Sequence, residues 1–168
     1  MILAAMFTVL TAAGAFLRIP MPVSSFTLQL LFTALAGLLL GRKWGAVSQA
    51  VYVLLGLAGL PVFTFGGGMS ALAQPTFGFL LGMIPMAWVI GFAAERRSPW
   101  LVCLIGLMVL YLIGLPYMHI ILTWYLGRPW SLWQTVWSGM VLFLPWDGIK
   151  LAAAVILYRR LRKILPRS

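Results

Sequence analysis

The sequence contains only two acidic residues, Glu95 and Asp147, against twelve Lys and Arg residues. Glu95 lies in a polar break beside Arg96 and Arg97, whereas Asp147 lies within an apolar run. Lys150 follows Asp147 by three positions, and residues at this spacing share roughly one face of a helix. Because ionised groups are costly in an apolar segment, the pair indicates a binding site for a polar ligand or, as the alternative, a structural ion pair between helices.

The composition indicates a membrane protein. The chain has 168 residues, of which 63% are hydrophobic and 8% are charged, whereas soluble domains have roughly 45–50% apolar and about 25% charged residues. A domain of this size exposes much of its surface and cannot hide so much apolar area from water. The net charge of +10 comes from short basic clusters between apolar runs. That pattern is typical of the basic clusters that orient a protein in a lipid membrane, and not of a nucleic-acid-binding face.

The apolar runs predict an all-α, polytopic fold with six transmembrane helices in a single domain, residues 1–168. The predicted spans cover about residues 2–17, 26–40, 44–60, 75–94, 100–122 and 146–161. A short interfacial helix is expected over about residues 132–143, because this stretch is rich in Trp and ends before Pro145.

The basic clusters predict the orientation of the chain. Arg42–Lys43, Arg96–Arg97 and the tail from Arg159 carry most of the positive charge, and the opposite breaks carry only Arg18 and Arg128. The positive-inside rule then places both termini in the cytoplasm of a multi-pass protein of the plasma or inner cell membrane. Asp147 and its partner Lys150 consequently fall in the outer half of the last span.

Further candidate binding residues lie in the outer connections. In the loop Pro61–Gly68, Phe63 and Phe65 can cover a small ring and Gly67 can expose its N–H, although a flexible turn is the alternative. Gln74 and Thr76 offer polar groups, and Trp146 offers a flat apolar wall beside Asp147. Gln29 is a second amide on this side, with either a ligand or the backbone as its partner.

Ala4, Thr8 and Ala12 form a stripe of small residues on the first predicted span. Such stripes let helices approach closely. Packing within the chain is one interpretation, and docking to a separate membrane partner is the other.

The sequence offers little material for catalysis or for cofactor binding. Gly37–Lys43 has the wrong spacing for a nucleotide-binding loop, and no acidic residue is near it to organise magnesium. His119 is the only histidine and has no Cys or carboxylate cluster near it in sequence. Asp147 is the one carboxylate expected in a buried position. We therefore expect no enzyme activity, no metal and no cofactor.

Four stretches in this order together resemble the BioY family, the substrate-capture (S) components of energy-coupling-factor (ECF) biotin transporters. They are Arg18–Pro22 with Phe26–Gln29, Gly59–Phe63 with Gly66–Gly67, Pro75–Phe79, and Leu144–Lys150. The resemblance covers nearly the whole chain. It implies a six-helix S-component fold that binds biotin near the outer face, together with two kinds of partner: a transmembrane coupling protein and two cytoplasmic ATPase subunits.

The resemblance also implies roles for particular residues. Asp147 and Lys150 match the family's biotin-contacting pair, and the loop from Phe63 together with the Pro75–Thr76 turn matches substrate-site loops. A lid is implied by Pro22, Phe26 and Thr27, and the first span is implied to face the coupling protein. Gln74, Phe77, Phe79 and Trp146 depart from the family pattern. An S component for another small vitamin, or a ligand-free membrane scaffold, is therefore kept as an alternative.

Overall fold

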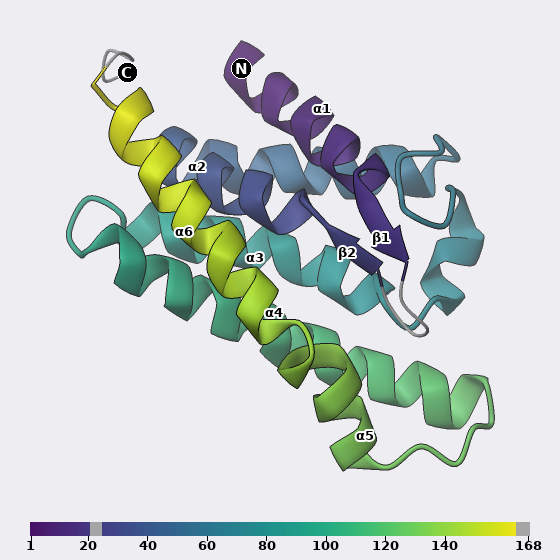
Figure 1. The fold of residues 1–168 in the computed structure, drawn as a ribbon. Helices are drawn as coiled ribbons and strands as arrows, with labels where there is room; N and C mark the ends of the chain where they lie inside the picture. The colour runs from purple at the N-terminus through teal and green to yellow at the C-terminus, as the bar shows by residue number, and fades with distance from the viewer. Residues whose placement is uncertain (21–24, 164–168) are drawn as a thin grey trace.

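The computed structural model describes residues 1–20 and 25–163. Its described part is an all-helical bundle with one small β-hairpin (Figure 1). The helical elements are α1 Ile2–Phe16, α2 Gln29–Leu57, η1 Met69–Ala73, α3 Phe77–Ala93, α4 Pro99–Ile120, η2 Ile121–Tyr125, α5 Leu132–Val136, η3 Trp137–Val141 and α6 Leu144–Leu161. The start of α1 and the end of α6 lie at the same end of the bundle (Figure 1).

Helix α2 is two antiparallel halves and not one straight rod. Gly41 interrupts it with a φ of 74° and a ψ of −176°, a backbone conformation that glycine adopts readily. In a straight helix, residues 23 apart would be about 35 Å apart at about 1.5 Å per residue. Instead, the side chain of Gln29 reaches the hydroxyl of Tyr52 at 2.6 Å. The chain therefore folds back at Gly41, and a polar seam joins the two halves.

Small residues allow close packing at this turn. A Cβ atom on Gly91 of α3 would collide with the backbone of Gly41 and Arg42, and one on Gly37 would lie 2.8 Å from the carbonyl oxygen of Ala87. Backbones approach this closely only where side chains are absent or small. The end of α3 is thereby held against the turn of α2.

A short antiparallel hairpin connects α1 to α2. Strand β1, Arg18–Pro20, pairs with β2, Ser25–Thr27, with Ile19 opposite Phe26. The predicted spans leave residues 18–25 as a connection without secondary structure. Strand β1 has β2 as its only strand neighbour in the described residues, and a proline is tolerated in such an edge strand because it has no N–H to contribute.

The last helices differ in detail from the sequence prediction. Helical turns run from Leu132 through Val141, and α6 begins at Leu144, two residues earlier than expected. Pro145 lies in the first turn of α6, where its missing N–H has no helical partner to lose. A reciprocal pair of hydrogen bonds between Ser131 and Gln134 caps the start of α5.

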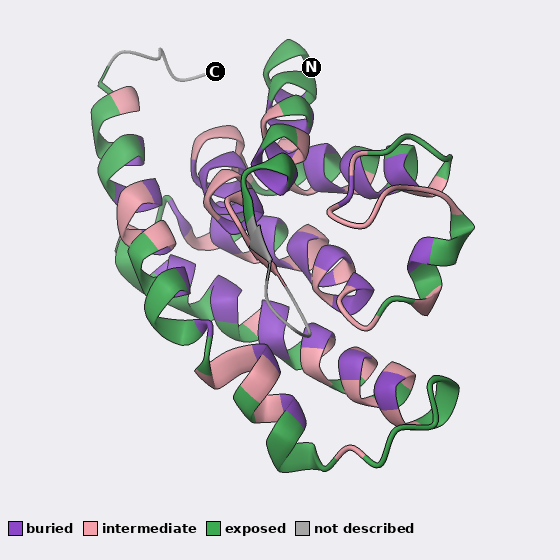
Figure 2. Cartoon of the chain, turned by 45° about the vertical axis from the view of Figure 1, so that its right-hand side comes forward, coloured by how far each residue is buried: buried purple, intermediate pink, exposed green. Residues whose placement is uncertain are grey.

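The bundle is apolar inside and outside. Its buried faces point inward and its exposed faces point outward (Figure 2), yet the outward faces carry large apolar side chains such as Val9, Leu104 and Leu112. Among the described residues, three helical stretches are long and apolar enough to span a membrane: Gln29–Leu57, Pro99–Tyr125 and Leu132–Leu161. Such an outer surface suits contact with lipid and would be unfavourable in water.

Candidate functional site

Asp147 lies in the first turn of α6 and is only 6% exposed. Its backbone N–H donates to the carbonyl of Phe143 at 2.9 Å, which fixes the first turn. A carboxylate at this end of a helix interacts favourably with the positive end of the helix dipole. Local structure therefore lowers part of the cost of burying this charge.

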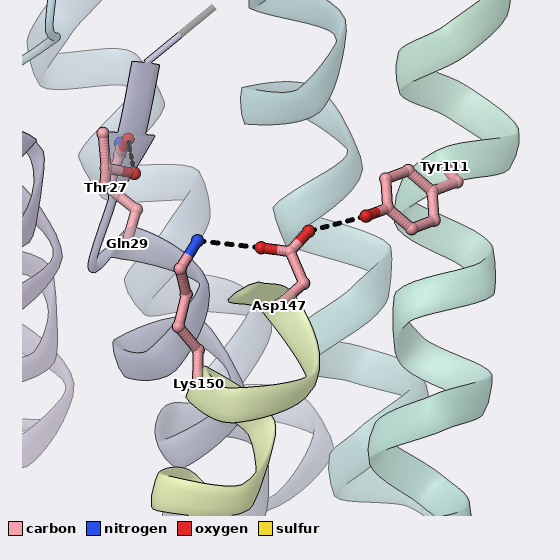
Figure 3. A network of polar contacts seen from close by, with 5 residues as sticks. All are labelled: Thr27, Gln29, Tyr111, Asp147 and Lys150. Carbon is pink, nitrogen blue, oxygen red and sulfur yellow. Dashed lines mark hydrogen bonds and ion pairs between the residues drawn. The ribbon is translucent and has the colours of Figure 1, made fainter. Parts of the chain in front are cut away.

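Two donors hold the carboxylate of Asp147 from opposite sides (Figure 3). The ammonium of Lys150 donates to Oδ1 at 2.8 Å, and the hydroxyl of Tyr111 on α4 donates to Oδ2 at 2.6 Å. Each carboxylate oxygen can accept more than one hydrogen bond. The carboxylate is thus held in place and still has acceptor capacity for the N–H groups of a ligand.

Strand β2 reaches the same cluster through an aromatic side chain. The ring of Phe26 lies 5.8 Å from the Lys150 ammonium, measured to the ring centroid, within the range of a cation–π contact. The same ring packs against Phe143 at 4.6 Å and against Trp146 at 5.6 Å. The hairpin therefore rests directly on the charged pair.

A cavity of about 90 Å³ opens beside Asp147 and Lys150. Its remaining lining residues come from β2, α2, α3, α4, the segment between α2 and α3, and the segments before α6: Ser25, Thr27, Gln29, Leu30, Thr64, Phe65, Thr76, Phe79, Leu80, Met83, Leu110, Tyr111, Gly139 and Phe143. Polar and apolar side chains thus line the chamber together, and polar groups in the sites of small organic ligands fix the orientation of the ligand.

Besides Gln29, the structure brings five of the predicted site residues to this cavity: Thr27, Phe65, Thr76, Asp147 and Lys150. They come from β2, the segment between α2 and α3, and α6, which are far apart in the sequence. The predicted binding loop, turn and lid therefore converge on one chamber.

Four other predicted binding residues do not line the cavity. Phe63 is 2% exposed and packs among Tyr52, Phe65 and Phe77, so its ring supports the loop from behind. Gly67 lies so close to the backbone of Leu60 that a Cβ atom would collide with it, which gives this glycine a packing role.

Gln74 and Trp146 lie on the surface. Gln74 is exposed where η1 ends, and Trp146 is 53% exposed on the outer side of Phe26. The lid residue Pro22 falls outside the described residues, whereas Thr27 lines the cavity and Phe26 packs against Lys150.

The predicted docking stripe on α1 faces into the bundle. Ala4 and Thr8 are buried, Ala12 is half-buried, and the Thr8 hydroxyl lies 2.9 Å from the carbonyl oxygen of Ser48 on α2. These contacts correspond to the internal-packing interpretation. The exposed face of α1 carries Val9 and other large apolar side chains instead.

Sequence reasoning missed Tyr111 altogether. This residue lies within an apolar span with no charged neighbour in sequence, and only the packing of α4 against α6 brings it to Asp147. Gln29 was one of the amide candidates, and the structure places it in the cavity wall. Among the described residues, no three His, Cys, Asp or Glu side chains gather to form a metal site.

Comparison with known proteins connects this geometry to a family. The chain is 43% identical to a probable biotin transporter BioY of Lysinibacillus sphaericus, over 98% of this chain and 87% of the relative. It is 38% identical to the biotin transporter BioY of Thermotoga maritima, over 98% of this chain and 96% of the relative.

A solved structure gives the same result. The fold matches a crystal structure at 2.1 Å described as the S-component for biotin from an ECF-type ABC transporter. The TM-score is 0.76 at 30% sequence identity, over 96% of this chain and 89% of that one. The profile of the BioY family matches residues 1–167. The chain therefore belongs to the BioY family.

Proposed function

We propose that this protein is the biotin-capture subunit of an ECF transporter and that biotin binds in the cavity beside Asp147 and Lys150. The observation that carries the proposal is the buried carboxylate, held by Lys150 and Tyr111, at the wall of a chamber in a BioY-family chain. The relatives are named as biotin transporters, and the matching solved structure is described as an S-component for biotin. Transport, and not enzymatic catalysis, is the activity of these proteins.

The chemistry of the site suits biotin. Biotin has a ureido ring with two N–H donors and one carbonyl acceptor, an apolar bicycle, and a chain ending in a carboxylate. Asp147 has acceptor capacity for the ureido N–H groups, and Lys150 can donate to the ureido carbonyl or to the carboxylate. Apolar side chains such as Phe65, Phe79 and Met83 can pack against the bicycle.

Pre-organisation supports tight binding at this site. Lys150 and Tyr111 fix the Asp147 carboxylate through contacts within the protein, so little ordering of that group is required when biotin binds. The cavity of about 90 Å³ is smaller than the roughly 300–1,000 Å³ of typical ligand pockets. We therefore expect the proposed lid, which includes Phe26 and Thr27, to move away from the cavity when the ligand enters.

The chain is a multi-pass protein of the cell membrane, and we propose six spans with both termini in the cytoplasm. Because α2 folds back at Gly41, each of its halves would cross the membrane once. Helices α1, α3, α4 and α6 would add four crossings. The basic breaks at Arg42–Lys43 and Arg96–Arg97 and the end of α6 would then face the cytoplasm.

Topology reporters test this arrangement. A single cysteine placed at Arg18 or Arg128 in a Cys103→Ala background should react with a membrane-impermeant maleimide added to intact cells. Cysteines placed at Lys43 or Arg97 should react only after the cells are opened. The opposite pattern would invert the orientation, and labelling of all four from outside would contradict the six-span arrangement.

We further propose that this subunit works with a transmembrane coupling protein and two cytoplasmic ATPase subunits. The match to an S-component from an ECF-type ABC transporter supports membership of such a complex. The docking surface is expected on outward-facing residues of α1, because Ala4 and Thr8 are used within the bundle.

A competition assay tests the proposed substrate. Purified protein loaded with labelled biotin should lose the label to unlabelled biotin and keep it in the presence of riboflavin or thiamine. Saturable binding of labelled riboflavin or thiamine, without saturable binding of labelled biotin, would support the alternative of an S component for that vitamin. Absence of saturable binding by any vitamin would favour a ligand-free scaffold.

A further inference from the structure

A second group of buried polar side chains lies beside the cavity, away from Asp147. Gln29 donates its side-chain N–H to the Tyr52 hydroxyl at 2.6 Å and accepts the Thr27 hydroxyl at 2.9 Å. The Tyr52 hydroxyl in turn donates to the carbonyl of Val62 at 2.9 Å. Gln29 and Thr27 line the cavity, and Figure 3 shows them on the far side of Lys150 from Asp147. Tyr52 lies behind them and is fully buried.

The protons of this chain of hydrogen bonds fix the orientation of the amide. A tyrosine hydroxyl has one proton, and here it is given to Val62, so the Tyr52 oxygen can only accept from Gln29. The amide nitrogen of Gln29 must therefore face Tyr52, and its oxygen must face the donating hydroxyl of Thr27. One N–H and one lone pair of the amide remain available to the cavity.

The hydroxyl of Tyr52 also joins two segments of the cavity wall to the second half of α2. Gln29 begins α2 directly after β2, and Val62 precedes Thr64 and Phe65, which line the cavity from the segment between α2 and α3. Tyr52 itself lies in the second half of α2. A single buried oxygen thus links the hairpin, the helical core and this segment.

We propose that Tyr52, which does not line the cavity, is a positioning residue for ligand binding. Its hydroxyl holds the Gln29 amide in one orientation and holds the segment at Val62 against the cavity. The inference rests on the proposed function, because biotin is the ligand used to test it. Fixing polar groups in the bound geometry before the ligand arrives lowers the ordering cost of binding.

Tyr52→Phe is the informative substitution. It keeps the ring, which packs edge-on against Phe63 at 5.5 Å, and removes only the oxygen. The Gln29 amide and the segment at Val62 would then sample several arrangements, and the apparent Kd rises as the competent fraction falls. We expect the Kd for biotin to rise about ten- to hundredfold, the range set by leaving buried polar groups unpaired.

Kinetics separate this role from a purely structural one. Loss of a pre-formed site slows association by about the same factor as it raises the Kd, while the dissociation rate changes little. A structural defect would lower the melting temperature and leave the Kd of the folded protein unchanged. Thr11→Val is the control, since Thr11 is a buried threonine that bonds Gln49 and does not line the cavity.

A double-mutant cycle tests whether Tyr52 acts through Gln29. In a Gln29→Leu background, Tyr52→Phe should raise the Kd less than it does in the wild-type protein, because one of the two groups that it positions is gone. Thr27→Val releases the amide from the other side and should slow association in the same way. This second variant keeps the test available even if Tyr52→Phe does not fold.

The outcomes are distinguishable. Slower association in Tyr52→Phe and in Thr27→Val, but not in Thr11→Val, supports the inference. If the wild-type protein binds biotin and folded Tyr52→Phe has the same Kd, the inference is overturned while the proposed function stands. Additive effects in the cycle have the same consequence. Failure of the wild-type protein to bind biotin overturns the proposed function itself.

Discussion

Asp147→Asn is expected to raise the Kd for biotin by about two to three orders of magnitude, since breaking one partner of a buried charge pair costs about 3–5 kcal/mol. Both oxygens of Asp147 accept, one from Lys150 and the other from Tyr111. An asparagine has only one acceptor oxygen and an NH₂ donor. If the amide NH₂ faces Lys150, a donor faces a donor, and if it faces Tyr111, that hydroxyl must turn to accept. In both orientations an acceptor for a ureido N–H is lost. Isothermal titration with biotin measures the change.

The chain provides a matched control in its only other acidic residue. Glu95 is exposed and does not line the cavity, so Glu95→Gln should leave the Kd unchanged. Lys150→Ala should weaken binding to a similar extent as Asp147→Asn, because it leaves the carboxylate without its cation. Unchanged affinity in both site variants would contradict the assignment of the site.

Stability is separated from binding by replacing both charges together. A buried ion pair exchanged for apolar residues of similar volume is often neutral or stabilising. Asp147→Leu combined with Lys150→Met should therefore recover the melting temperature lost in the single variants and still fail to bind biotin. Biotin binding by the double variant would show that the pair is structural only.

Uptake of biotin against a concentration gradient is expected to be abolished when the chain is expressed without a coupling module. The sequence has no phosphate-binding loop with the required Gly and Lys-Ser/Thr spacing, and in the proposed function the ATPase subunits supply ATP hydrolysis. In a host that lacks such a module, the chain alone should bring labelled biotin at most to equal concentrations on the two sides of the membrane.

Co-expression provides the positive arm of this experiment. Accumulation should appear when a transmembrane coupling protein and two ATPase subunits are added, and it should disappear when the ATPases lose their nucleotide-binding lysines. Surface expression of the chain is matched in all arms by quantitative labelling. Concentrative uptake by the chain alone in the module-free host would contradict the proposed division of labour.

The fold class could be predicted from composition and from the places where helices stop. The all-helical fold is confirmed, and the break expected at Gly41–Lys43 coincides with the turn at Gly41. The strands β1 and β2 could not be predicted, because a run with several prolines carries no alternating pattern. The number of spans and their orientation stay predictions.

The candidate site could be predicted only where charge or a motif marked it. Asp147 and Lys150 stood out because ionised groups are rare in apolar segments, and the structure pairs them at 2.8 Å. Tyr111 has no such mark, since an aromatic residue in a membrane helix is unremarkable until its hydroxyl finds a partner. Its contribution depends on how α4 packs against α6.

Side-chain direction limited the remaining predictions. Phe63 and Phe65 are two positions apart in one loop, yet Phe65 lines the cavity and Phe63 packs behind it. The stripe of Ala4, Thr8 and Ala12 could equally face a partner or the bundle, because spacing fixes a face of a helix but not what that face contacts. Only the contacts of Thr8 with α2 show its direction.

A structure of the protein with biotin bound tests the central claim most directly. We predict that the ligand lies in the cavity beside β2 and α6, with a ureido N–H of biotin within hydrogen-bond distance of an Asp147 carboxylate oxygen and with Tyr111 still donating to that carboxylate. Biotin bound elsewhere on the bundle, with the cavity closed around an unchanged Asp147–Lys150 pair, would contradict the account.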